Sequence, residues 1–419
     1  MQSFDKGFER PKKESAGAGA LEISGQDIIN GVYQETIQKF NAIYIDVVKN
    51  IESPIKLTDP TTLPASTGNG VAFSPNNTYL AVAHLSSPFV TIYKRSGDTF
   101  TKLTNPATLP PSTGNGVAFS PDNTYLAVGH NSSPFVTIYK RSGDTFTKLT
   151  NPATLPASTV RSVAFSSDGV YLSTAHFGSP HVTIYKRSGD TFTKLTNPAT
   201  LPASTGNSVA FSSDNTYLTV GHDSSPFVTI YKRSGDTFTK LTNPAILPTS
   251  SGTGVAFSPD VTYLAVSNQF GDRFLTIYKR SGDTFTKLAD PATPPAGQSN
   301  SVAFTPDDTY LAVVHFTSPF ITIYKRLGDT FTKLTNPATL PAAAGNGVAF
   351  SATDVYFAVC HGTTPFVTIY KGTVVLTNFG VFKSNNLISN LQDRSGAGYV
   401  LKSGVKGDEN EVVRLWRDV

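Results

Sequence analysis

Short apolar runs separated by turn residues recur throughout residues 51–372. Successive repeats are 46 residues apart, with a single step of 47. A period in the forties that contains about four short apolar runs is typical of a β-propeller blade. The pattern therefore predicts an all-β chain that forms a seven-bladed β-propeller. The repeats are marked by the tripeptide Val-Ala-Phe, which begins at Val71, Val117, Val163, Val209, Val255, Val302 and Val348.

Each repeat predicts four antiparallel strands and one long connector. Clusters of Ser, Pro, Asp and Asn separate the first two strands, and a Lys-Arg-Ser-Gly-Asp segment between the last two predicts a hairpin turn. Gly143 supplies the positive φ that such a turn needs. A connector rich in Pro, Thr and Ser leads to the next repeat. In the repeat at Gly116 the four strands are 117–119, 125–129, 135–139 and 145–149.

The strand count predicts how the ring closes. The first three strands occur seven times, but the fourth follows only six of these sets and last appears at residues 333–335. Upstream of all repeats, residues 55–60 match residues 101–106 closely. We expect this segment to pair with residues 366–370 and complete the last blade, which removes two exposed sheet edges. Residues 373–377 are an alternative for the same strand.

The N-terminal flank predicts two different segments. Residues 1–23 are rich in Gly, Ser and Lys, which indicates a disordered or extended arm. Residues 24–50 predict an amphipathic helix, with Ser24 as the N-cap and an apolar seam of heptad spacing. The seam would either pack on the propeller's own underside or associate with a second copy of the chain. It consists of Ile29, Tyr33, Thr36, Phe40, Ile43 and Val47.

The C-terminal flank, residues 373–419, predicts a small β-rich unit. Residues 399–404 and 411–416 alternate as strands, with a turn at 404–408 between them. Both flanks are expected to leave the ring at the face that carries the hairpin turns. We therefore interpret them as an anchoring module. Its candidate contact residues are Ile29, Tyr33, Phe40, Ile43 and Trp416.

Composition and motif content limit the classes of function that we expect for this chain. A net charge of +4 over 419 residues gives no argument for nucleic-acid binding. Cys360 is the single cysteine, and residues 1–20 predict neither a signal peptide nor a membrane span. The sequence has no His-Glu-x-x-His, Gly-x-Ser-x-Gly, phosphate-binding loop or Cys-x-x-Cys pattern. We therefore expect no catalytic residue and no cofactor.

Six repeats place a His at the same point, and the fifth has Asn268 there instead. A metal site is one reading of this ring. Strands spaced about 4.8 Å apart would leave neighbouring His residues roughly 9 Å from one another, whereas zinc needs each nitrogen within about 2.1 Å. We therefore expect a structural role, in which each His binds the loop that follows it. The ring consists of His84, His130, His176, His222, His315 and His361.

The repeats differ from one another mainly in the loops after these His residues and in the connectors. Drift in tolerant loops is one explanation, and a recognition surface is the other. Aromatic residues and Arg dominate protein interfaces. The candidate binding residues are Arg161, Phe177, Phe270, Arg273 and Phe316.

Residues 117–130 together with 135–140 resemble tryptophan-aspartate repeats, with Tyr139 where the Trp usually stands. The pattern is also similar to bacterial lactonase-like propellers and to repeat proteins of bacteriophage structural regions. The Gly-Tyr-x-Leu run that begins at Gly398 resembles β segments of phage capsid-cement and head-fibre proteins.

The phage resemblance implies a non-enzymatic virion protein, assembled in the host cytoplasm, that decorates a capsid or binds a host surface. It would hold capsid or tail proteins through its arm and tail, and a host glycan or protein through its free face. The alternatives are a bacterial intracellular scaffold located in the cytoplasm, and a lactonase-like hydrolase.

Overall fold

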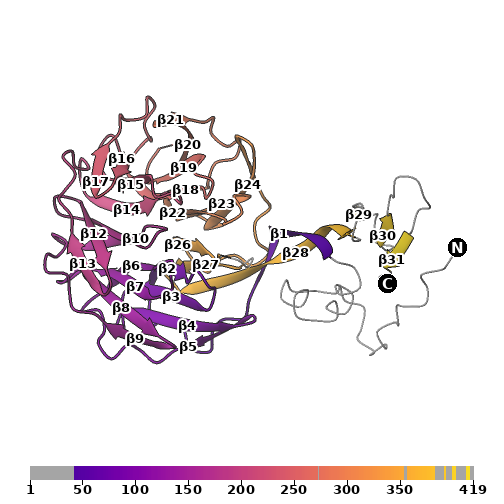
Figure 1. Ribbon diagram of the computed structural model, residues 1–419, viewed down its shortest axis with the longest axis horizontal. Helices are drawn as coiled ribbons and strands as arrows, with labels where there is room; N and C mark the ends of the chain where they lie inside the picture. Colours follow the sequence, from indigo (N-terminus) through magenta and orange to yellow (C-terminus); the bar gives the residue numbers. More distant parts are fainter. Residues whose placement is uncertain are drawn as a thin grey trace. The chain divides into compact units, whose positions relative to one another are not determined.

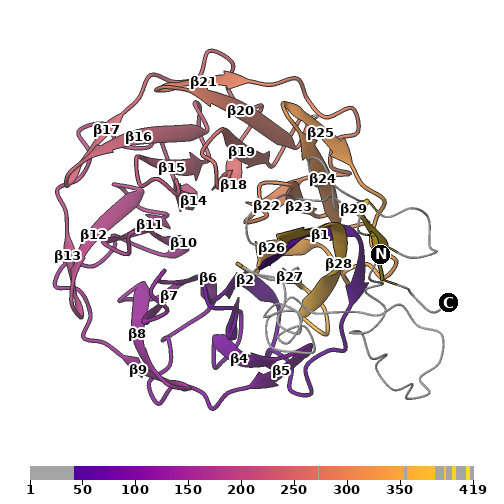
Figure 2. The same ribbon diagram turned by 45° about the vertical axis from the view of Figure 1, so that its right-hand side comes forward.

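In the computed structural model, seven sheets are arranged in a ring around a common centre (Figure 2). The structure describes residues 42–271, 273–352, 356–382, 391–392, 399–402 and 412–415. The chain divides into two compact units, residues 51–371 and the flanks 1–50 with 372–419. The ring lies in the first unit.

Every blade contains four strands in the predicted order, and the first strand lies nearest the centre of the ring (Figure 2). The first strands are β2 (Gly68–Phe73), β6 (Gly114–Phe119), β10 (Val160–Phe165), β14 (Gly206–Phe211), β18 (Gly252–Phe257), β22 (Ser299–Phe304) and β26 (Gly345–Phe350). The second strands are β3 (Tyr79–His84), β7 (Tyr125–His130), β11 (Tyr171–His176), β15 (Tyr217–His222), β19 (Tyr263–Asn268), β23 (Tyr310–His315) and β27 (Tyr356–His361). The third strands are β4 (Val90–Ser96), β8 (Val136–Ser142), β12 (Val182–Ser188), β16 (Val228–Ser234), β20 (Leu275–Ser281), β24 (Ile321–Leu327) and β28 (Val367–Phe382). The fourth strands are β5 (Thr99–Lys102), β9 (Thr145–Lys148), β13 (Thr191–Lys194), β17 (Thr237–Lys240), β21 (Thr284–Lys287), β25 (Thr330–Lys333) and, in blade 7, β1 (Ala42–Lys56).

The cores lie between adjacent blades. Tyr79 and Ile92 of blade 1 pack against Val117, Leu126 and Phe146 of blade 2, and equivalent clusters follow around the ring. The rings of Tyr79 and Phe146 meet edge to face, with centroids 5.8 Å apart. Second strands are buried on both sheet faces, which explains their continuous apolar sequence. Each blade therefore depends on its neighbours for stability.

The predicted closure is confirmed. β1 is the outer neighbour of β28, so the N-terminal strand supplies the fourth strand of blade 7 (Figure 1). The Leu57 amide donates to the Ile369 carbonyl at 2.8 Å, as the Leu103 amide donates to the Ile92 carbonyl in blade 1. The alternative closing strand, residues 373–377, is wrong, because these residues continue β28 as far as Phe382.

The predicted helix over residues 24–50 is wrong for its last part, because residues 42–50 belong to strand β1. Ile43, a predicted anchoring residue of this helix, lies in the strand. Its run Ile43-Tyr44-Ile45 is rich in β-branched and aromatic residues that favour strands, and the outer edge of β28 offers a pairing partner. The arm 1–23 and the candidate anchors Ile29, Tyr33 and Phe40 lie outside the described residues.

In the C-terminal flank, β30 (Tyr399–Lys402) and β31 (Val412–Leu415) pair antiparallel, as the alternating pattern predicts. A two-residue strand, β29 (Leu391–Gln392), pairs with β28. Trp416 lies outside the described residues. No helix in the part of the chain that the structure describes is long and apolar enough to cross a membrane.

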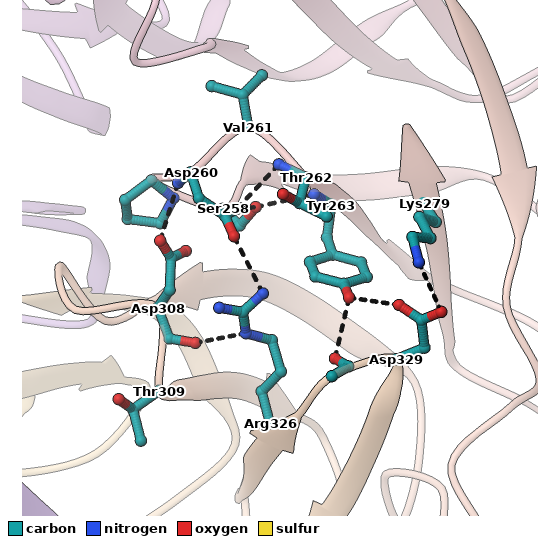
Figure 3. A network of polar contacts seen from close by, with 12 residues as sticks. Ser258, Asp260, Val261, Thr262, Tyr263, Lys279, Asp308, Thr309, Arg326 and Asp329 are labelled. Atoms are coloured by element: carbon teal, nitrogen blue, oxygen red, sulfur yellow. Dashed lines mark hydrogen bonds and ion pairs between the residues drawn. The ribbon is translucent and has the colours of Figure 1, made fainter. Parts of the chain in front are cut away.

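A repeated polar contact joins each blade to the next (Figure 3). The Tyr263 hydroxyl of blade 5 donates to the Asp329 carboxylate in the blade 6 hairpin at 2.5 Å, and Lys279 reaches the other oxygen of this carboxylate at 2.8 Å. The Arg326 guanidinium lies 5.0 Å from the centre of the Tyr263 ring. The same hydroxyl–carboxylate bond joins Tyr79 to Asp144, Tyr125 to Asp190, Tyr171 to Asp236, Tyr217 to Asp283 and Tyr356 to Asp98.

At the closing blade, Glu52 of β1 takes the position of the hairpin Asp. It accepts from Lys325 of blade 6 at 2.6 Å, as Asp329 accepts from Lys279. Glu52 stands 46 residues before Asp98, so it occupies the equivalent place in the repeat. The N-terminal strand therefore closes the ring with backbone pairing and also with the charge that this contact requires.

We expect deletion of residues 51–60 to give protein that aggregates, because β28 would be left with an unpaired edge and blade 6 without its carboxylate. Light scattering and thermal unfolding measure the outcome. A matched control replaces residues 51–60 with the equivalent residues 97–106, which restore a strand and an acidic residue, and should remain monomeric. A soluble deletion variant with an unchanged melting temperature would disprove the closing role.

Candidate functional site

The ring has two faces with different chemistry. The turns between first and second strands and the hairpins between third and fourth strands share one face, here called the turn face. The loops between second and third strands and the long connectors share the other, the loop face. All five candidate binding residues belong to loop-face segments or to the strand start beside them.

The buried Tyr of each third strand holds the loop face in place. Tyr139 has no exposed surface, and its hydroxyl donates to the Thr108 carbonyl in the connector at 2.9 Å. All seven blades repeat this bond. This Tyr therefore fixes the connector, because its hydroxyl donates to a connector carbonyl in every blade.

The ring His residues are structural. Each is buried, and its Nε2 lies 2.8–3.0 Å from a Thr hydroxyl of the third strand. In blade 5 the amide of Asn268 replaces the imidazole and donates to Thr276 at 2.9 Å. Burial lowers the pKa of every ring His to about 4, so all are neutral at pH 7.

Two of these residues also bind the following loop, which the sequence predicts for all six. The prediction is wrong for the other four, whose Nδ1 atoms are buried without a hydrogen-bond partner: His84, His130, His222 and His361. The Nδ1 atoms of His176 and His315 lie 2.8 Å and 2.7 Å from the carbonyl oxygens of Gly178 and Thr317. A carbonyl oxygen only accepts, so Nδ1 carries the proton and Nε2 accepts from the Thr hydroxyl. Among the described residues, no cluster of three or more His, Cys, Asp or Glu side chains has the arrangement of a metal site.

Several large apolar side chains are exposed in the loops between second and third strands. Phe177 and Phe316 directly follow the ring His and are 58% and 51% exposed, and Phe270 is 54% exposed in the longer loop of blade 5. Their backbones are held by the connectors: the Phe177 amide donates to the Thr159 carbonyl at 3.0 Å. Leu85 is a fourth exposed residue of this kind, which comparison of the repeats could have found. These residues have the exposure that recognition requires, and their binding role stays a prediction.

The two candidate Arg residues have different surroundings. The Arg161 guanidinium lies 5.7 Å from the centre of the Phe177 ring and donates to the Asn207 side-chain oxygen of blade 4. Arg273 lies 3.7 Å from the carboxylate of Asp290 in the following connector. The structure therefore brings Arg161 and Phe177 together and places Arg273 in a separate ion pair.

A set of Asn side chains on the first strands, around the centre of the ring, was not identified from the sequence. Five blades have an Asn two residues before the Val of the marker, where blade 3 has Arg161 and blade 5 has Thr253. Each of these Asn side chains donates to a backbone carbonyl at the start of the next blade's first strand, at 2.8–3.2 Å. The five are Asn69, Asn115, Asn207, Asn300 and Asn346.

Asp308, on the turn face, is the one described carboxyl whose pKa is raised. Desolvation, followed by the Asp260 charge, raises its pKa to about 6. One of its oxygens accepts from the Asp260 amide at 2.9 Å, and the other is buried without a partner (Figure 3). A raised pKa can mark a catalytic acid. The equivalent position is Asn in blades 1, 2 and 4, where the side-chain oxygen accepts the same kind of bond, so the site is structural.

Comparison with known proteins gives a family match and a structural similarity. The profile of a family described as "Lactonase, 7-bladed beta-propeller" matches residues 69–245 and 162–350. Hydrazine synthase of Kuenenia stuttgartiensis is a similar solved structure, with a TM-score of 0.58 and 16% identity. The similarity covers 76% of this chain and 97% of that one, and it shows the fold alone. A search of curated protein sequences gives no match.

We expect Asp308→Asn to stabilise the ring by about 1 kcal/mol at pH 7, less than the full pKa shift would give because the residue is partly exposed. A folded pKa above the unfolded value means that stability is lost as pH rises from about 4 through 6. The gain should therefore disappear near pH 4. Asp307→Asn is the control, because it removes the same charge from a more exposed neighbour. Denaturant unfolding at both pH values measures this, and equal effects of the two variants would contradict it.

Proposed function

We propose that this chain, which belongs to the lactonase family of seven-bladed β-propellers, is a non-enzymatic binding propeller that presents its loop face to a partner. The observation that carries the proposal is where the repeats differ. Strand residues and the residues that join the blades are nearly the same in all seven copies. Exposed aromatic residues and the unmatched Arg161 stand at the rim of one face. Such residues are typical of binding surfaces.

The His and Asp side chains that hydrolysis could use each make a structural hydrogen bond. A lactonase needs a general base or a metal-bound water to attack the ester carbonyl. The ring His residues are neutral, but they are buried and bonded to Thr hydroxyls. Asp308 lies on the turn face, away from the loop-face rim, and one of its oxygens is bonded to a backbone amide. Lactone hydrolysis remains the second candidate because of the family match.

The finer proposal is that the propeller is displayed on a phage particle and held there by its two flanks. Its support is the resemblance of the run that begins at Gly398, in the C-terminal flank, to phage structural proteins, together with the closure of the ring. β1 and β28, which connect to the two flanks, are neighbouring strands of one blade. On this proposal the flanks bind capsid or tail proteins, and the loop face binds a glycan or protein of the host surface.

We expect the purified full chain to hydrolyse δ- and γ-lactones no faster than buffer between pH 6 and 9. A pH-indicator or coupled assay gives the rate. Turnover above background that is lost in Arg161→Asn would establish the hydrolase and reject the binding proposal. This variant restores the residue that five other blades carry, so loss of activity could not be attributed to misfolding.

We expect a chain trimmed to residues 42–382, which retains both closing strands, to fold as a monomer and to bind no particle. The full chain should co-sediment with the candidate phage particle, because the flanks provide the attachment. Light scattering gives the mass, and sedimentation gives the bound fraction. If the trimmed ring co-sediments as well as the full chain, the anchoring role of the flanks is wrong.

A further inference from the structure

Two positions of the repeat meet at the loop-face rim. They are the residue two before the Val of the marker and the residue after the ring His. In blade 2, Asn115 donates to the Asn131 side-chain oxygen at 2.7 Å, and in blade 4, Asn207 donates to Asp223 at 2.6 Å. In blade 3 the pair is Arg161 and Phe177. The residue after the ring His therefore differs from blade to blade, while the first strand beside it keeps the same place.

These polar side chains lie along the rim of blades 2 to 4 and are together called the polar arc. Arg161 donates to Asn207, and Asn207 donates to Asp223, so one amide joins the guanidinium to the carboxylate. The polar arc consists of Asn115, Asn131, Arg161, Asn207 and Asp223. In the other four blades the same two positions carry no charge. These pairs are Thr253 with Gln269, Asn300 with Phe316, Asn346 with Gly362, and Asn69 with Leu85.

The polar arc is held in place before any ligand arrives. The Asn115 amide also donates to the Val160 carbonyl at 2.9 Å, and the Asn207 amide to the Gly252 carbonyl at 3.2 Å. The Ser251 hydroxyl donates to the Asp223 carbonyl at 3.2 Å, which fixes that loop. Side chains that are already ordered lose little entropy on binding.

The chemistry of the polar arc indicates a neutral ligand with many hydroxyl groups. Arg161 and Asp223 balance each other's charge, so the site has no net attraction for an ion. Arg161 gives Asn207 one of its five N–H donors, and Asp223 accepts from Asn207 at one oxygen. Both side chains are exposed, and both retain further hydrogen-bonding capacity within the described structure. The exposed Phe177 ring beside them offers an apolar surface.

We propose that the polar arc and Phe177 bind a neutral carbohydrate. Adjacent hydroxyls of a pyranose would take bonds from Arg161 and give bonds to Asp223, while the C–H face of the sugar packs on Phe177. This inference rests on the proposed binding function and names its ligand class.

The test is a titration of the full chain with methyl glycosides of glucose, galactose, mannose and N-acetylglucosamine. Saturation-transfer NMR detects weak binding, and calorimetry measures the affinity. We expect binding of at least one glycoside, weakened tenfold or more in Arg161→Asn and in Asp223→Asn, because each removes a charged hydrogen-bonding partner. Leu327→Ser is the matched control. It restores a repeat residue at an exposed turn-face position and should bind as the parent does.

Three results would overturn the inference: no binding of any neutral glycoside, binding that is unchanged in both arc variants, or tighter binding of glucose 6-phosphate than of glucose. None of these affects the proposed function, which the lactone assay tests separately. Thermal unfolding of the two arc variants should match the parent. The reason is that both replacements occur naturally in other repeats. Five blades have Asn at the position equivalent to Arg161, and blade 2 has Asn131 at the position equivalent to Asp223.

Discussion

The pairing of β1 with β28 is the contact on which the rest of the ring depends. Because the apolar clusters lie between blades, an open ring would expose the facing surfaces of two blades and not merely one strand edge. Closure also completes the polar contacts between blades, since Glu52 supplies the carboxylate that the last hairpin lacks. A single exposed ion pair contributes little stability. Its two partners lie on strands that backbone pairing already fixes, Glu52 on β1 of blade 7 and Lys325 on β24 of blade 6.

Three side-chain bonds recur in most or all of the repeats. One Tyr holds the connector, the ring His joins the second strand to the third through a Thr, and another Tyr with a Lys binds the hairpin Asp of the next blade. These bonds occupy the residue types that most often act in catalysis. We therefore propose that function depends on positions that take part in none of them, at the rim of the loop face.

Much of this fold could be predicted from the sequence. The period of the repeats gives the blades, and the last repeat lacks a fourth strand that a matching segment upstream of all repeats can supply. The helix over residues 42–50 was wrong because apolar residues there fit both a heptad and an alternating strand, and only the free edge of β28 decides between them. The Thr partner of each His and the contact of Asn207 with Asp223 depend on strand register. Register places residues that are 16 positions apart in the sequence side by side.

A ring of near-identical units has no preferred direction unless some units differ. Here the charged differences on the inner rim, Arg161 and Asp223, fall in two adjacent blades and are joined by the amide of Asn207. The replacements are tolerated because side chains at these positions support no core cluster: they end at the rim, while the adjacent Val of the marker packs inside. A symmetric scaffold can thus obtain a directional site by changing two or three rim residues, without any change to the contacts that hold its blades together.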